Sequence, residues 1–298
     1  YVQRGLLYAN FDEYGSAIAD YKYADSLLSV RYPEDSNSRM HILLAMANCW
    51  YHKKDFAVAK KNYSHYSVLC KSKYGDQSME YANSLYYLAN IEGFTNEKQV
   101  GCKDYRQAAI LLKELIKKQL RYLPTNARTK YWNDLSDILW NMTAYAVKKG
   151  VKQEPFACDA YNALVFSKGL LLESERSMRN LLRQSGTEED LALYNKMLLL
   201  QSRLTEVERA TGKGTENANE LYSQIDQIDK QLASKCSFYG NYTQFLNTQY
   251  KDIKNALKEG EVAIDFTDFK LDSVHCYAAY VLRKEWEYPL LVPDRKSV

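Results

Sequence analysis

The feature that most constrains the fold is an internal repeat with a spacing of 42 residues. An aromatic residue, an alanine and a second aromatic residue recur at helical intervals, first as Tyr14, Ala17 and Tyr21 and then as Phe56, Ala59 and Tyr63. Each residue of the second set lies 42 positions after its counterpart in the first: 56 after 14, 59 after 17 and 63 after 21. Repeats of this length are typical of stacked helical units that need their neighbours to bury an apolar face. The pattern therefore predicts an array of helix pairs.

A third copy of the repeat follows, with an insertion. Its first helix repeats Leu43 to Asn48 as Leu85 to Asn90, again 42 residues later. Its second helix begins at Tyr105, which is 49 residues after Phe56, so seven residues are added between the two helices. The polar stretch from Thr95 to Gly101 is the expected place for them, because exposed turns tolerate insertions.

Composition and charge agree with long helices and narrow the classes of partner. Only 12 glycines and 5 prolines occur in 298 residues, which is few for a turn-rich β fold. The 40 Lys and Arg against 37 Asp and Glu give a net charge of +3, without the basic excess of a nucleic-acid-binding protein. A nucleic-acid-binding helical array is therefore the weakest functional alternative. No apolar run approaches the roughly 20 residues that span a bilayer, so no membrane partner is predicted.

The cysteines and histidines give no metal-binding pattern. The closest two of the six cysteines, Cys49 and Cys70, are 21 residues apart, which excludes paired zinc ligands. Scattered thiols of this kind are typical of reduced, cytoplasmic proteins. His41, His52 and His65 have no carboxylate or cysteine at ligand spacing. We predict a cytoplasmic protein with no metal and no cofactor.

The repeated pattern resembles the tetratricopeptide repeat (TPR). In that family a small residue lets two antiparallel helices approach closely, and bulky residues fill the groove to the next pair. TPR units are commonly about 34 residues long, so a spacing of 42 implies longer helices. The resemblance is strong over residues 1–122, and a degenerate fourth pair is expected from Trp132 to Trp140 and from Ala157 to Leu164. Residues 1–172 are thus predicted to form a TPR-like α-solenoid.

The resemblance also implies a binding groove. TPR arrays bind extended peptides or partner helices along the face formed by the first helix of each pair. Asn48 and Asn90 occupy equivalent positions, where the family uses Asn to hydrogen-bond a ligand backbone. The predicted partner-binding groove consists of His41, Leu44, Asn48, Tyr51, Asn83, Tyr86 and Asn90. The alternative is that these side chains only solvate the surface or cap a neighbouring helix.

Residues 173–259 are predicted to be a helical linker. Apolar residues have helical spacing from Glu188 to Ala210, and the segment from Gly212 to Gly214 interrupts them. A heptad-like apolar seam then runs from Leu221 to Leu232, so an antiparallel hairpin of two helices is expected. A shorter helix from Tyr250 to Leu257 ends before Gly260, a residue suited to a helix C-terminus.

The periodicity changes from helical to alternating after Gly260. Val262, Ile264 and Phe266 alternate with more polar or smaller residues, and a second strand-like run extends from Cys276 to Lys284. Two such runs joined by a polar loop predict a β-hairpin. A sheet that begins after a helical array indicates a new domain, which we place at residues 260–298.

The segment from Asp252 to Pro293 resembles the opening of a CHAT domain, a caspase-like cysteine peptidase domain found behind TPR arrays. The shared features are an amphipathic helix, the Gly260-Glu261 pair, a strand from Ala263 to Phe266, and a strand from Tyr277 to Arg283 followed by Pro289. The resemblance implies a mainly α chain whose short C-terminal β-hairpin begins an incomplete α/β caspase-like domain. The sequence is accordingly expected to be a piece of a longer protein.

The family implies a catalytic His and Cys, in which the imidazole assists the thiolate. These residues are expected downstream of the hairpin, beyond Val298, so no catalytic residue is assigned in this chain and it should be inactive alone. The adjacent pair His275 and Cys276 does not match, because neighbouring side chains on a strand point to opposite faces.

Two classes of function remain. The predicted function is the interaction and regulatory arm of a bacterial-type TPR–CHAT cysteine peptidase, with a protein or peptide ligand in the groove. The alternative is a non-enzymatic TPR scaffold that assembles other proteins. Only the segment after Gly260 favours the peptidase.

Overall fold

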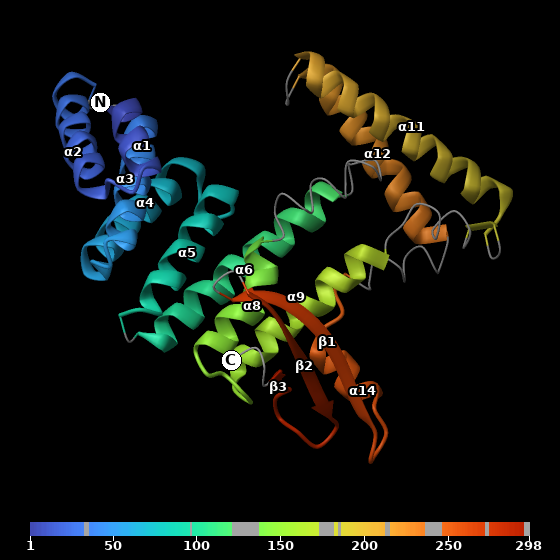
Figure 1. The fold of residues 1–298 in the computed structure, drawn as a ribbon. Helices are drawn as coiled ribbons and strands as arrows, with labels where there is room; N and C mark the ends of the chain where they lie inside the picture. The colour runs from blue at the N-terminus through green and yellow to red at the C-terminus, as the bar shows by residue number, and fades with distance from the viewer. Residues whose placement is uncertain are drawn as a thin grey trace. The chain divides into compact units, whose positions relative to one another are not determined.

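The computed structural model of the chain is mostly helical and ends in a small antiparallel sheet (Figure 1). It describes residues 1–32, 36–95, 97–120, 137–172, 182–183, 186–211, 215–235, 246–271 and 274–294. Within these ranges there are eleven α-helices and three β-strands. The predicted mainly α architecture with a C-terminal hairpin is thus confirmed.

The chain divides into two compact units, Tyr1–Leu112 and Lys113–Val298. The domain boundaries predicted after residues 172 and 259 remain predictions, because a division by contacts does not identify domain families. Each unit is described by itself below.

The first unit consists of consecutive helices that match the predicted repeats. They are α1 (Val2–Asn10), α2 (Tyr14–Arg31), α3 (Ser36–His52), α4 (Phe56–Tyr74), α5 (Met79–Glu92) and the first part of α6 (Lys98–Leu120). The turns within the first two pairs share one backbone feature: Asp12 and Lys54, 42 residues apart, have φ angles of 61° and 63°. Helices α4 and α5 begin with side-chain N-caps: Asp55 accepts a hydrogen bond from the Val58 amide, and Ser78 accepts one from the Tyr81 amide. The repeat is therefore visible in the backbone as well as in the sequence.

Small residues allow the helices of each pair to pack closely. Ala17, Ala47 and Ala59 are completely buried in the cores of the first two pairs. At Gly5, which is equivalent to Ala47, an added Cβ would lie 2.8 Å from the ring of Tyr21. Helix packing in this unit thus depends on a small residue against an aromatic one.

The second unit contains a helix pair followed, later in the chain, by the sheet. Helices α8 (Asp137–Lys148) and α9 (Pro155–Leu172) occupy the place of the predicted fourth pair. The Trp132 end of that predicted pair lies outside the described residues. Residues Ala157, Tyr161 and Ala163 of α9 are fully buried, as a packed second helix requires.

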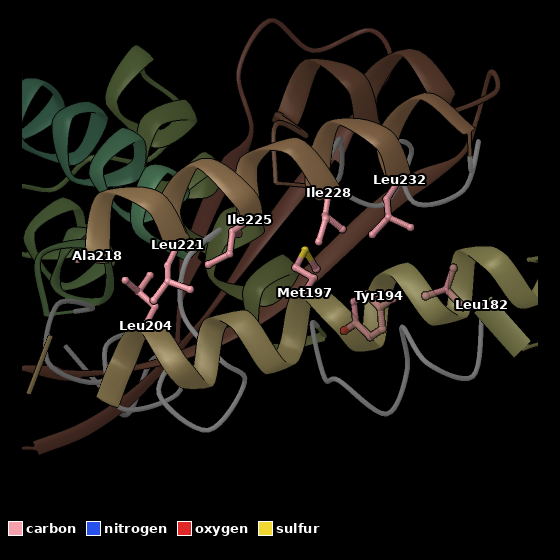
Figure 2. Close-up of a cluster of buried hydrophobic side chains, with 9 residues drawn as sticks. All are labelled: Leu182, Tyr194, Met197, Leu204, Ala218, Leu221, Ile225, Ile228 and Leu232. Atoms are coloured by element: carbon pink, nitrogen blue, oxygen red, sulfur yellow. The ribbon is translucent and has the colours of Figure 1, made fainter. Parts of the chain in front are cut away.

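Helices α11 (Glu188–Thr211) and α12 (Glu216–Lys235) form the predicted hairpin. The four seam residues of α12, namely Leu221, Ile225, Ile228 and Leu232, are buried. Figure 2 shows them directed toward Tyr194, Met197 and Leu204 of α11. The hairpin therefore has a hydrophobic core of its own. The segment from Gly212 to Gly214 lies outside the described residues.

The sheet follows α14 (Tyr250–Ala256) and a left-handed turn residue, Gly260 with φ of 81°. Strands β1 (Val262–Leu271), β2 (Val274–Arg283) and β3 (Leu290–Pro293) are antiparallel and ordered β1-β2-β3. The β1–β2 register runs from Val262 opposite Arg283 to Leu271 opposite Val274. The third strand is additional to the predicted hairpin.

The inward face of the sheet packs on the helix pair α8 and α9. Tyr280 of β2 is fully buried; its ring stacks on Tyr161 of α9 with centroids 5.1 Å apart, and its hydroxyl lies 3.0 Å from Thr143 Oγ1 of α8. The Leu291 amide donates to the Lys152 carbonyl at 2.7 Å. Helices and sheet thus share one core within the second unit.

Candidate functional site

The predicted groove residues lie on the first helices of the second and third repeats. His41, Leu44, Asn48 and Tyr51 belong to α3, and Asn83, Tyr86 and Asn90 belong to α5. His41 and Asn48 are exposed, and the other five are half-buried. All seven therefore present some surface to solvent, and their role in binding stays a prediction.

The two equivalent asparagines make different hydrogen bonds. Asn48 Oδ1 accepts from the hydroxyl of Tyr63 on α4, at 2.6 Å. Asn90 Nδ2 donates to the Tyr86 carbonyl of its own helix, at 3.0 Å. The reason lies in the partner helix: the third repeat has Leu112 where the second has Tyr63, and leucine has no hydroxyl. Asn48 therefore has a structural partner in its own repeat, and the repeat pattern alone did not reveal that bond.

Aromatic side chains cluster beside the predicted groove residues. Tyr86 meets the ring of Tyr105 edge-on, with centroids 5.4 Å apart. Tyr51 lies 5.9 Å from Phe56 and 5.6 Å from Phe94, and these two phenylalanines stack at 4.6 Å. Such clusters combine apolar contact area with directional ring packing, and they are typical of protein-binding surfaces.

The aromatic cluster extends into the first repeat through His52. Its ring stacks on Tyr14 at 5.0 Å and meets Tyr51 edge-on at 5.6 Å. The 42-residue spacing could have revealed this row, because Tyr14 and Phe56 are equivalent, as are His52 and Phe94. Of the rings in this row, only Tyr51 belongs to the predicted groove.

A charged cluster lies where α4, α5 and the inserted turn meet. Lys60 Nζ lies 2.5 Å from Glu97 Oε2 and 3.4 Å from Glu92 Oε1. Glu92 is only 4% exposed, and its Oε2 has no hydrogen-bond partner in the described part of the chain. Burial, together with the nearby Asp104 carboxylate, raises the pKa of Glu92. Lys60 has the opposite effect on Glu97, whose pKa its hydrogen bond lowers.

A second polar site lies between the helix pair and the sheet. Asp265 of β1 accepts from the Tyr161 hydroxyl at 2.5 Å and from Lys168 Nζ at 2.6 Å. Burial, and then the bond to Asp265, raises the pKa of the Tyr161 hydroxyl, which therefore remains protonated near neutral pH. The three groups satisfy each other, so this site is a structural link between α9 and the sheet.

A cavity of about 160 Å³ lies next to that link. Its walls come from α8, α9 and β1, through Leu139, Trp140, Thr143, Leu164, Ser167, Lys168, Phe266, Thr267 and Asp268. The lining mixes apolar side chains with hydroxyl and charged groups. Nothing in the sequence patterns pointed to this cavity, because its walls are about 100 residues apart along the chain.

His275 and Cys276 do not form a dyad. His275 is exposed, whereas Cys276 is 1% exposed on the inward face of the sheet. This agrees with the expected alternation. Across the described residues, no group of three or more His, Cys, Asp or Glu side chains is arranged to hold a metal ion. In the same ranges, no helix has the length and apolar character needed to cross a membrane.

Comparisons of the chain with protein-family models, with curated proteins and with solved structures gave no match.

Proposed function

We propose that this chain is the partner-binding and regulatory arm of a TPR–CHAT cysteine peptidase, and that it acts in the cytoplasm. The observation that carries the first part is the recurrence of one surface on successive helix pairs. Equivalent positions of α3 and α5 present polar and aromatic side chains beside a row of rings in edge-on contact. Repeating surfaces of this type suit extended ligands, because each repeat contacts one part of the ligand.

The hairpin after Gly260 supports the peptidase part. Its outward face carries Val262, Ile264 and Phe266, which are 44%, 51% and 75% exposed. Contiguous apolar surface of this kind favours a covering layer of protein, such as the remainder of an α/β domain. The alternative, a non-enzymatic scaffold, is equally compatible with the helices but gives no reason for this face.

A cytoplasmic location is supported by the cysteines. Cys49 and Cys70 are buried free thiols. Free thiols are typical of reducing compartments.

Peptide ligands selected by display on the purified chain would test the groove. Tyr86→Ala removes an aromatic contact from α5 and should weaken a groove-bound peptide by about tenfold. Tyr23→Ala, at an exposed position of α2 outside the groove, is the matched control and should leave affinity unchanged. If the wild-type chain and both variants bind the peptide with equal affinity, the predicted groove is not the binding site.

Asn48 needs a separate design, because replacing it also leaves the Tyr63 hydroxyl without its acceptor. In a Tyr63→Phe background that bond is already absent, so a further Asn48→Ala change reports ligand contact alone. A loss of affinity in this background supports a ligand-binding Asn48. Unchanged affinity would assign Asn48 to the helix pair only.

Sequencing the gene downstream of the Val298 codon tests the peptidase part of the proposal. We expect a continued α/β domain with a histidine and a cysteine at strand ends, and no peptide cleavage by the present chain alone. A stop codon directly after Val298 in the intact natural gene, or cleavage by the present chain, would contradict this part.

A further inference from the structure

The cavity beside β1 lies at the edge of the sheet. Phe266, Thr267 and Asp268 are consecutive, and all three line it. Consecutive side chains on a strand point to opposite faces, so three in a row can border one cavity only where it meets the strand edge. The other edge of β1 pairs with β2, where these residues face Ala279, Ala278 and Tyr277. The cavity therefore adjoins the outer edge of β1.

That outer edge has no partner strand among the described residues. Strand β1 is terminal in the order β1-β2-β3, and in the described part of the chain no strand pairs with its other side. An unpaired edge presents a row of backbone amide and carbonyl groups that can hydrogen-bond to an added strand. An extended peptide can bind in this way, with a neighbouring pocket selecting one of its side chains.

The size of the cavity defines that side chain. A volume of about 160 Å³ is close to the roughly 150 Å³ of an apolar cavity that admits benzene. Leu139, Trp140 and Leu164 supply its apolar walls. A phenyl or leucyl side chain is therefore the appropriate anchor, lying across from Thr267.

The outward face of β1 defines the residues on either side of the anchor. They would lie across from Phe266 on one side and Asp268 on the other, since cross-strand neighbours share a face. Phe266 is 75% exposed, and the Asp268 side chain is 42% exposed, with His275 Nδ1 lying 3.8 Å from its Oδ2. An apolar residue complements the first and a basic residue complements the second.

We infer that the outer edge of β1 and the adjoining cavity form a binding site for an extended peptide with an apolar residue, a phenylalanine-sized anchor and a basic residue in succession. The site lies outside the groove of the proposed function, and it shares only Phe266 with the face that the proposed α/β domain would cover. The direction of the added strand sets the order of the three residues, and both orders are tested.

The experiment uses the whole chain labelled with 5-fluorotryptophan, whose Trp140 ¹⁹F resonance is assigned as the one missing from Trp140→Phe. The probes are acetyl-Thr-Val-Phe-Lys-Thr-amide and its reversed sequence. We expect saturable movement of the Trp140 resonance with one of them. A peptide with alanine in place of phenylalanine should bind about tenfold more weakly, because the cavity is left unfilled.

Protein variants locate the site. Thr267→Phe fills the cavity from within and should abolish the movement, whereas Val262→Phe, at an exposed position on the same strand, should not. Asp268→Lys should favour a peptide with glutamate in place of lysine by about threefold. Such a reversal of charge preference cannot arise from a folding defect, so it remains decisive if Thr267→Phe is unstable.

Any of three binding results would overturn the inference: no saturable movement of the Trp140 resonance with either peptide, equal binding to Thr267→Phe, or an unchanged charge preference in Asp268→Lys. Dimerisation of the chain alone that Thr267→Phe abolishes would also overturn it, in favour of pairing between two copies. Tyr86→Ala should leave peptide binding at β1 intact, so failure of the groove and failure of this site are distinguishable.

Discussion

The helix pairs of the first unit and the helix–sheet core of the second are built in different ways. In the first unit, one arrangement recurs every 42 residues, with a small residue packed against an aromatic ring. In the second, the contacts are individual. Tyr161 of α9 contacts both Asp265 and Tyr280, which lie about 100 residues later in the sequence. A repeated arrangement distributes stability over equivalent sites, whereas an individual one concentrates it in a few side chains.

The two units also use polar groups differently. In the first, a bond between Asn48 and Tyr63 joins two helices of one pair, whereas Asn90 of the next repeat bonds a carbonyl of its own helix. In the second, the buried hydroxyls of Tyr161 and Tyr280 each have a partner on another element. Substitutions should therefore be tolerated better in the repeats than in the helix–sheet core.

The largest effect is expected at Tyr280. Tyr280→Ala removes a fully buried ring that stacks on Tyr161, and should cost about 3–5 kcal/mol of the free energy of unfolding. Hydrogen exchange should then show lost protection in β1 and β2, with α2 to α4 unchanged. Tyr277→Ala, at a 58% exposed position three residues earlier on the same strand, is the control and should cost much less. Equal losses from the two variants would show that the helix–sheet core is not the concentrated one.

The next effect is expected at Gly5, within the repeat. Gly5→Ala places a Cβ 2.8 Å from the Tyr21 ring and should destabilise the chain by about 1–3 kcal/mol in chemical denaturation. Gly15→Ala is the matched control, since nothing lies within 4 Å of its added Cβ and the residue lies in the first turn of α2. It should stabilise by about 0.5 kcal/mol, because alanine has less conformational freedom than glycine in the unfolded chain. If Gly5→Ala also stabilises, the close approach of α1 to Tyr21 is wrong.

Much of the fold could be predicted because equivalent positions of the repeat can be aligned with one another within the one sequence. Ala17 and Ala59 mark helix contacts at a fixed offset, and the alternation from Val262 to Phe266 marks a strand. The fixed offset identifies equivalent positions but not the bonds they make, such as the hydrogen bond from Tyr63 to Asn48. It also could not reveal contacts between non-repeated elements, such as Asp265 with Lys168. The cavity beside β1 belongs to this second class, so only the three-dimensional arrangement identifies it.

A smaller effect is expected from the single hydrogen bond that distinguishes the second repeat. Tyr63→Phe removes the donor to Asn48 and should cost about 1 kcal/mol, measured by urea denaturation. Tyr21→Phe, at the equivalent position of the first repeat, should cost less, because Leu6 stands where Asn48 stands and cannot accept a hydrogen bond. Equal costs would mean that the Asn48 bond contributes nothing to the difference between the repeats.

The smallest and most condition-dependent effect concerns Glu92 in the third repeat. Burial raises the pKa of Glu92, so the folded state holds this proton more tightly than the unfolded chain does. Stability from this group is therefore complete below the ordinary pKa of 4.5 and is lost as pH rises through the raised value. Asp104, whose pKa burial also raises, acts in the same direction, and Glu97, whose pKa Lys60 lowers, acts in the opposite one.

Glu92→Gln should remove the contribution of Glu92 to the decline in stability, so the difference in unfolding free energy between variant and wild type should change above pH 4.5. The exposed Glu80→Gln serves as control, and a constant difference between Glu92→Gln and wild type from pH 4 to pH 8 would contradict a buried, proton-retaining Glu92.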